Sequence, residues 1–158
     1  MTFKTKLIHA SLPAMFALLT ASVTPAHADS VDDATAAVQS KMVEWRRDFH
    51  ENPELSNREF RTAGIVADEL RALGLEVTTD IAVTGVVGVL KGDKPGPVIA
   101  FRADMDALPM PEETGLPFAS RVTAEYNGST VPVAHACGHD AHTAILLGAA
   151  SILSEMKS

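Results

Sequence analysis

The stretch VIAFRADMDALP, residues 98–109, decides the predicted fold because an apolar run of strand length leads directly into two carboxylates. Residues 98–103 are almost continuously apolar, which predicts a central β-strand with both faces buried. The glycine- and proline-rich turn 92–97 precedes this run, and residues 75–79 and 85–90 predict two earlier strands. The strands that flank the turn are expected to pair as an antiparallel hairpin.

Helices are predicted both before and after these strands in the sequence. In residues 31–50 and 58–73, apolar side chains recur every three or four positions, as they do in amphipathic helices. Asn57 is the expected N-cap of the second helix, and Gly74 is its expected C-terminal stop. Residues 140–156 carry a broad apolar face and form the third expected helix. Helices, strands and a final helix together predict an α/β sandwich.

The last predicted helix and the loop before it complete the pattern. Residues 104–135 are rich in proline and glycine, so a long functional loop is expected there. Gly148 on the last helix is expected to allow a close packing contact. A helix that leaves a sheet normally returns as another strand, but the sequence reaches Ser158 at that point. We therefore expect residues 29–158 to be the N-terminal part of a larger catalytic domain, with an incomplete sheet.

The first segment, residues 1–28, has the features of a secretory signal peptide. Two lysines open the chain, the apolar run 12–23 follows, and Ala-His-Ala at 26–28 is a small-x-small cleavage site. The alternative is a membrane anchor, but the run is shorter than the roughly 20 residues that span a bilayer. We expect cleavage, a periplasmic or secreted mature protein, and no membrane association afterwards.

The composition is that of a globular protein, with 46% hydrophobic and 21% charged residues. The net charge is −7, and loss of the two lysines of the signal segment makes it −9. Such an acidic chain is not expected to bind nucleic acid, because phosphate recognition needs clustered Lys and Arg. The one cysteine, Cys137, cannot form an internal disulfide, so it is a free thiol, an intermolecular partner or a metal ligand.

The stretch HACGHDAH, which begins at His135, carries the strongest chemical signal. Cys137 and His139 lie on either side of Gly138, whose backbone can bend so that both side chains face one point. Thiolate and imidazole suit zinc and related divalent metals, and the start of a helix favours the negative charge of a thiolate. His142 lies three residues after His139 and is a candidate ligand, indirect support or substrate contact. Hydrogen-bonded structural histidines are the alternative.

Asp104 and Asp106 form the second signal, at the carboxyl end of the predicted strand 98–103. Ligands of open α/β sheets bind beyond the carboxyl ends of their strands. The two carboxylates can hold a metal, orient a ligand histidine or tune the pKa values of a site. For Asp104, a solvated turn is an equally good interpretation, whereas Asp106 is better placed to support the site.

Three blocks of sequence closely resemble one enzyme family: residues 46–56, 101–109 and 135–143. It is the metallopeptidase-like, metal-dependent amidohydrolase family that includes hippurate hydrolases, N-acyl-amino-acid amidohydrolases and auxin-conjugate hydrolases. The blocks have the same order as in the family, and the resemblance runs from about residue 40 to the end.

The resemblance implies a two-metal catalytic domain with a smaller lid domain inserted later, and it is compatible with a homodimer of the complete enzyme. It implies that Cys137 and His139 bind divalent metal, manganese or zinc, and that Asp106 is a catalytic residue. Asp104, Asp140 and His142 are expected either to hold the ligands in place or to contact the substrate. The family's remaining ligands, a glutamate and two histidines, and its general-base glutamate have no counterpart here. The chain alone is therefore expected to bind metal weakly and to be inactive.

The expected reaction of the complete enzyme is hydrolysis of the amide bond of N-acyl amino acids or similar small, peptide-like amides by a metal-activated water. One alternative is a thiol hydrolase, with Cys137 as nucleophile and a neighbouring histidine as base. Another is a non-catalytic remnant that binds metal weakly.

Overall fold

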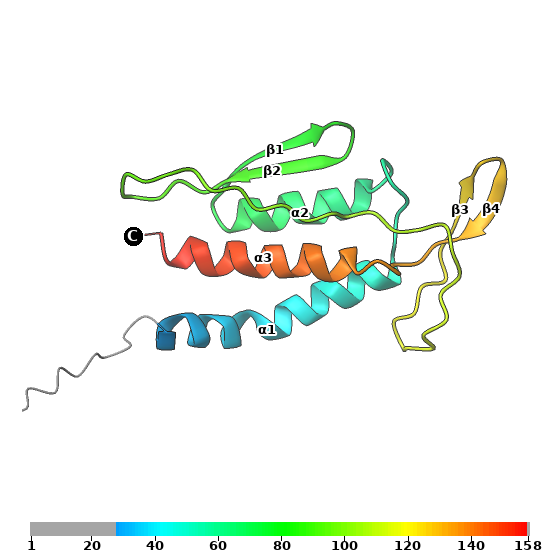
Figure 1. The fold of residues 1–158 in the computed structure, drawn as a ribbon, viewed down its shortest axis with the longest axis horizontal. Coiled ribbons are helices and arrows are strands. Elements are labelled where there is room, and N and C mark those ends of the chain that lie inside the picture. Colours follow the sequence, from blue (N-terminus) through cyan, green and yellow to red (C-terminus); the bar gives the residue numbers. More distant parts are fainter. Residues whose placement is uncertain (1–27, 158) are drawn as a thin grey trace, which may run out of the picture.

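The computed structural model of the protein describes residues 28–157. Its three helices, α1 (Ala28–Glu51), α2 (Phe60–Ala72) and α3 (His139–Glu155), confirm the helices predicted from apolar periodicity. They lie side by side, with α3 between α1 and α2 (Figure 1). No helix in this described part is long and apolar enough to cross a membrane. The predicted signal segment lies outside the described residues, apart from Ala28.

The main hydrophobic core lies between α1 and α3, and α2 closes it on one side. Trp45 and Phe49 of α1 pack with Ala144 and Leu147 of α3, and all four side chains are buried. Gly148 faces Met42 so closely that a Cβ at this position would overlap the methionine side chain. The predicted close contact at this glycine is confirmed, and it brings the two helices together.

The N-terminus of α2 is capped by a residue that lies outside the helix. Glu54 accepts hydrogen bonds from the backbone N–H groups of Arg61, at 3.0 Å, and Thr62, at 2.8 Å. The prediction that Asn57 is the N-cap was wrong, because Asn57 has φ 60 and its own N–H donates to Glu59, which directly precedes the helix. A carboxylate near a helix N-terminus satisfies free N–H groups and the positive end of the dipole.

The strands β1 (Glu76–Ile81) and β2 (Gly85–Val89) form an antiparallel hairpin that packs on α2 (Figure 1). Gly74, with φ 80, ends α2 as predicted and leads the chain into β1. The expected pairing of 85–90 with 98–103 was wrong, because β2 pairs with β1 instead. Only a short turn separates β1 from β2, so their pairing closes the smaller loop.

A second hairpin, β3 (Thr123–Tyr126) and β4 (Ser129–Pro132), lies within the region predicted as a loop. Its turn is Asn127-Gly128, and both residues have positive φ, 50 and 79. Asn-Gly between strands is a strong hairpin signal because both residues adopt positive φ readily. The prediction of a loop throughout 104–135 was therefore wrong at this point.

Residues 98–103 are not a central strand in the structure, contrary to the prediction. Val98 is 98% exposed, Ile99 69% and Phe101 65%. An apolar run becomes a central strand only where neighbouring strands take up its backbone hydrogen bonds. Within residues 28–157 the paired strands are β1 with β2 and β3 with β4, and neither pair extends to this segment. The fold is thus a mixed α/β arrangement with short sheets, and the predicted α/β class is confirmed.

Candidate metal centre

An extended segment, residues 104–108, passes the first turn of α3 and is held there by backbone hydrogen bonds. Ala107 N–H donates to the Glu54 carbonyl at 2.7 Å. Leu108 and Ala134 exchange two hydrogen bonds, of 3.0 and 3.1 Å. Ala107 and Ala134 are buried, so this part of the segment is rigidly placed. The carboxylates that precede it are therefore presented at a defined position.

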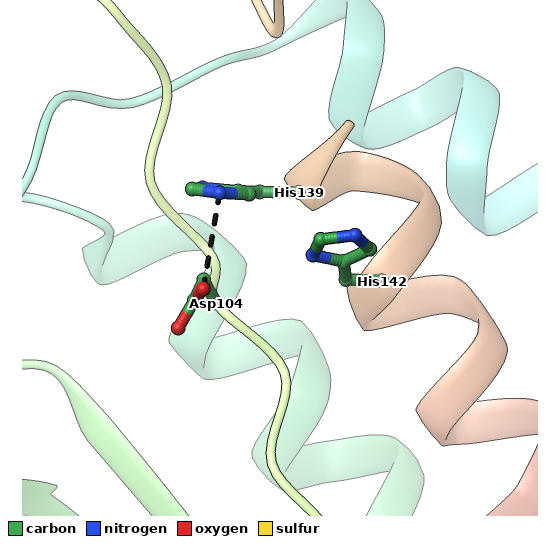
Figure 2. A group of neighbouring side chains, drawn as sticks. All are labelled: Asp104, His139 and His142. Atoms are coloured by element: carbon green, nitrogen blue, oxygen red, sulfur yellow. Dashed lines mark ion pairs between the residues drawn. The ribbon is translucent and has the colours of Figure 1, made fainter. Parts of the chain in front are cut away.

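Three side chains gather where this segment meets α3: Asp104, His139 and His142 (Figure 2). One ligand atom from each lies within 4.8 Å of the other two. Both histidines come from the first turn of α3, and their ring centroids are 5.4 Å apart. Two imidazoles and a carboxylate are donors that zinc and other divalent transition metals accept, so the group fits such an ion.

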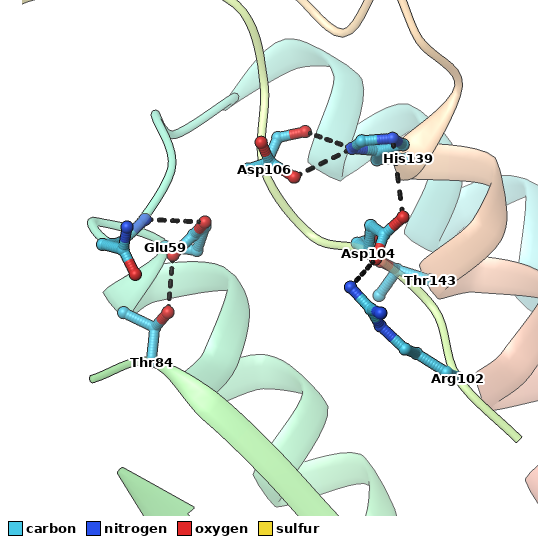
Figure 3. A network of polar contacts seen from close by, with 8 residues as sticks. Glu59, Thr84, Arg102, Asp104, Asp106, His139 and Thr143 are labelled. Atoms are coloured by element: carbon cyan, nitrogen blue, oxygen red, sulfur yellow. Dashed lines mark hydrogen bonds and ion pairs between the residues drawn. The ribbon is translucent and has the colours of Figure 1, made fainter. Parts of the chain in front are cut away.

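The ring of His139 is oriented by Asp106, as Figure 3 shows. Nδ1 lies 2.9 Å from the backbone carbonyl of Asp106 and 2.9 Å from its carboxylate Oδ1. The backbone carbonyl oxygen can only accept a hydrogen bond, and so can the carboxylate when it is ionised. Nδ1 therefore carries the hydrogen and donates it. In the neutral ring Nε2 then has a free lone pair, and this atom lies 3.8 Å from Oδ2 of Asp104. This is the arrangement in which a histidine can coordinate a metal.

Asp104 is fixed by contacts on both its backbone and its side chain (Figure 3). The Thr143 hydroxyl of α3 donates to the Asp104 carbonyl at 3.0 Å. Arg102 donates to Oδ1 at 2.8 Å, although the arginine side chain is 89% exposed and contributes little to stability. These contacts leave Oδ2 facing His139. The structure thus brings together Asp104, Asp106, His139 and His142, which the sequence had singled out.

Cys137 and Asp140 are placed differently from this group. Cys137 is a free, exposed cysteine and is not one of the three residues that gather in the described structure. Shared metal binding by Cys137 and His139 stays a prediction. Gly138 has φ 80, so the chain turns sharply between the cysteine and the helix. Asp140 is 2% exposed and its side chain is bound to α1.

The Asp140 carboxylate is the centre of a buried polar cluster between α1 and α3. Oδ2 lies 2.8 Å from Nδ1 of His50 and 2.9 Å from Nε of Arg46. On the other side of the His50 ring, Nε2 lies 2.9 Å from Oε2 of Glu112, without the alignment of a hydrogen bond. Hydrogen bonds from Thr114 lower the pKa of Glu112, and nearby His50 acts in the same direction. Two acids thus face one arginine and one imidazole.

His135 lies beside this cluster and has no hydrogen-bond partner on either ring nitrogen. It is 7% exposed and stacks on His50, with ring centroids 6.5 Å apart. Burial lowers its pKa to about 4, partly opposed by the charge of Asp140. His135 is therefore neutral at neutral pH. Burial of an imidazole without hydrogen-bond partners costs free energy, so substitution of His135 should change the stability of the protein.

Sequence reasoning missed His50, Arg46 and Glu112 as members of a polar cluster. Arg46 and His50 belong to the first block that resembles the enzyme family, so the block itself was the available signal. Their local setting gave none, because histidine and arginine near the end of an amphipathic helix usually lie in solvent. Glu112 lies in the long loop and meets His50 only through the tertiary fold.

Comparison with known proteins adds a family and several relatives. Residues 100–158 match the family described as Peptidase family M20/M25/M40. The chain is 43% identical over 120 residues to an N-acyl-L-amino acid amidohydrolase of Geobacillus stearothermophilus, which covers 76% of the chain and 30% of that protein. It is 50% identical over 123 residues to a protein of Rhodococcus jostii (strain RHA1) named as a glutamate–cysteine ligase, with 78% of the chain and 14% of that protein covered. The chain thus spans less than a third of the length of these relatives.

A solved structure has the same fold. It is a Bacillus subtilis protein described as a dinuclear metal-binding peptidase from the M20 family, with 41% sequence identity and a TM-score of 0.68. The match covers 77% of this chain and 32% of that one. At this identity the likeness supports a relationship in sequence as well as in fold.

Proposed function

We propose, for a chain whose residues 100–158 match the Peptidase family M20/M25/M40, that the complete protein hydrolyses the amide bond of N-acyl amino acids or similar small amides. One observation carries the proposal. His139 is held through Nδ1 by Asp106, and its free Nε2 faces Asp104 beside His142. The amidohydrolase name of one relative supports the substrate class.

The proposed cofactor is a divalent cation, zinc or manganese, with two ions in the complete site; the name of the dinuclear structural relative supports this number. A bound cation of this kind polarises an amide carbonyl and lowers the pKa of water to about 7. His139 would hold it together with Cys137, and Asp104 and His142 lie close enough to His139 to join or support it. Because a structural or catalytic zinc site uses three or four protein ligands, His139 alone would not suffice.

For Asp106 we propose that it orients a ligand histidine, which is one of the roles that the sequence left open for it, in place of the catalytic role given with the resemblance. Its contact is with Nδ1 of His139, at 2.9 Å, so it holds the imidazole in the tautomer that leaves Nε2 free. We assign Asp106 as a positioning residue for His139. Such hydrogen-bonding partners of a metal-binding histidine contribute about 10- to 100-fold to metal affinity or activity.

Export and partners are part of the same proposal. The basic start, apolar run and Ala-His-Ala site of residues 1–28 support a periplasmic or secreted protein. The acidic balance supports a small-molecule substrate and no nucleic acid. A homodimer of the complete enzyme stays a prediction.

A cobalt titration of the purified chain tests the metal site. In the wild type, we expect visible absorption from bound Co²⁺ and a sulfur-to-metal charge-transfer band. Cys137→Ser should lose the charge-transfer band. His139→Asn should weaken the binding of cobalt relative to the wild type, because Asn offers no imidazole nitrogen. If His139→Asn binds cobalt as tightly as the wild type does, His139 is not a ligand and the proposed site is wrong.

Activity of the complete protein separates this function from thiol catalysis. The exposed thiol of Cys137 is the observation that keeps the alternative in view. Hydrolysis of an N-acetyl amino acid should be lost in EDTA and restored by manganese or zinc. Activity that persists in EDTA and disappears after thiol alkylation would favour Cys137 as a nucleophile instead.

A further inference from the structure

We propose that His50 is a positioning residue, which acts through Asp140 to fix the first turn of α3 and thereby the direction of His139. The inference rests on the proposed metal site. It concerns a side chain on α1 that does not belong to the group of Asp104, His139 and His142. His50 is 3% exposed and lies in the last turn of its helix.

The argument starts from two consecutive residues of α3 that are bound to different parts of the chain. His139 contacts the segment at Asp106, at 2.9 Å, whereas Asp140 contacts α1 through His50, at 2.8 Å. Any rotation of the first turn that breaks one contact also moves the other. The direction of the His139 ring is therefore coupled to the contact between His50 and Asp140.

His50 can hold Asp140 because its ring is itself held on several sides. Nε2 lies 2.9 Å from Oε2 of Glu112, and the ring meets Phe118 edge to face, with centroids 5.6 Å apart. Arg46 contacts the same Asp140 oxygen, but its side chain is 35% exposed and long, so it is a weaker constraint on direction. The rigid, buried imidazole is the better positioned of the two partners.

The rest of α3 does not substitute for this contact at the first turn. Thr143 binds the Asp104 carbonyl at 3.0 Å, which limits sliding of the helix along the segment. The tight contact of Gly148 with Met42 lies further along the helix. The first turn of a helix lacks half of its backbone hydrogen bonds and frays first, so loss of the His50 contact should act locally there.

Two substitutions at position 50 test the proposal. His50→Asn keeps an N–H donor near the place of Nδ1, whereas His50→Leu has similar bulk and no donor. In the metal-free chain, His50→Leu should speed amide hydrogen exchange at residues 139–143 and change the ring ¹⁵N shifts of His139 away from the Nδ1–H tautomer. His50→Asn should stay close to the wild type in both measurements.

The same variants should separate in metal affinity. By isothermal titration with Zn²⁺, His50→Leu should bind roughly 10-fold more weakly than the wild type, as expected for loss of support behind a ligand. His50→Asn should recover most of this loss. If His50 only stabilised the fold, His50→Leu and His50→Asn would lose the same Zn²⁺ affinity whenever their stabilities were equal.

Two control variants isolate the contact. Glu112→Gln keeps a polar side chain of the same size beside Nε2 of His50 and leaves the Nδ1 contact with Asp140 in place, so His139 should keep its tautomer. Leu70→Ala lowers stability in the last turn of α2, where Leu70 packs toward β2 and the hydrophobic core. If Leu70→Ala, at a matched loss of stability, speeds exchange at residues 139–143 as much as His50→Leu does, the proposal is overturned.

The metal-free readouts keep this inference separate from the proposed function. If the wild type binds no Zn²⁺ but His50→Leu alters exchange and the His139 tautomer, the metal proposal fails and the positioning role stands. If His50→Leu leaves exchange at residues 139–143 and the ¹⁵N shifts of His139 unchanged, the positioning role is refuted, whatever the metal affinity.

Discussion

Replacement of His135 by leucine should make the protein less sensitive to acid. In the folded chain the His135 ring is 7% exposed, has no hydrogen-bond partner, and has a pKa of about 4 because burial disfavours the charged form. In the unfolded chain the same ring is solvated and has the ordinary histidine pKa of about 6.5. His135→Leu removes this difference in pKa between the two states and puts an apolar side chain of similar volume in the same place.

The size of the effect follows from the two pKa values. Between pH 6.5 and 4, the unfolded chain holds about one more proton on His135 than the folded chain does. The free energy of unfolding therefore falls as the pH falls, by up to about 1.4 kcal/mol per pH unit. The loss begins below about pH 6.5 and levels off below about pH 4, where both states are protonated. Its total is about 3 kcal/mol.

Urea unfolding at a series of pH values from 7.5 to 4 measures the effect. Carboxylates also contribute to the pH dependence, so the relevant quantity is the difference between His135→Leu and the wild type. At pH 7.5 the variant should be equally stable or more stable by about 1–2 kcal/mol, because two unpaired nitrogens are gone. The difference should then widen in its favour as the pH falls.

Two results would refute this reasoning. The first is a constant difference between variant and wild type from pH 7.5 to 4, which would mean that His135 titrates alike in both states. The second is a large loss of stability in His135→Leu at pH 7.5, which would mean that the ring nitrogens have partners. His142→Gln is the matched control for the loss of a histidine, because His142 is exposed.

Three further predictions concern the fold. Glu54→Ala should lower the free energy of unfolding by about 1–2 kcal/mol, because it removes the hydrogen bonds that cap α2; urea unfolding measures the loss. Gly148→Ala should give a net loss of about 1 kcal/mol in urea unfolding, because overlap of the new methyl group with Met42 outweighs the roughly 1 kcal/mol that alanine gains over glycine in a helix; Met42→Ala in the same chain should recover part of the loss. Phe101→Lys should change stability by no more than about 0.5 kcal/mol and raise solubility, because Phe101 is 65% exposed; a large loss in thermal unfolding would show that its ring is buried in solution.

Local patterns predicted the helices and some of their ends. The repeat of apolar side chains in α1, α2 and α3 is a property of each segment alone, and Gly74 ends α2 through its own backbone freedom. The β3–β4 hairpin was equally local, since Asn127-Gly128 is a hairpin turn, but the abundance of proline around it favoured a loop. The cap of α2 was not local in this sense, because Glu54 reaches the helix from outside it.

The sequence alone determined the helices and the chemical groups of the candidate site, because periodicity and side-chain chemistry are written in adjacent residues. Only the tertiary structure decided which of those groups meet. His139 and Asp106 are 33 residues apart, and His50 and Asp140 are 90 apart, yet both pairs are in contact. The exposure of residues 98–103 was also decided at this level, since a strand is central only when other strands reach it. Burial and pairing depend on segments that are distant along the chain, and no local pattern encodes their approach.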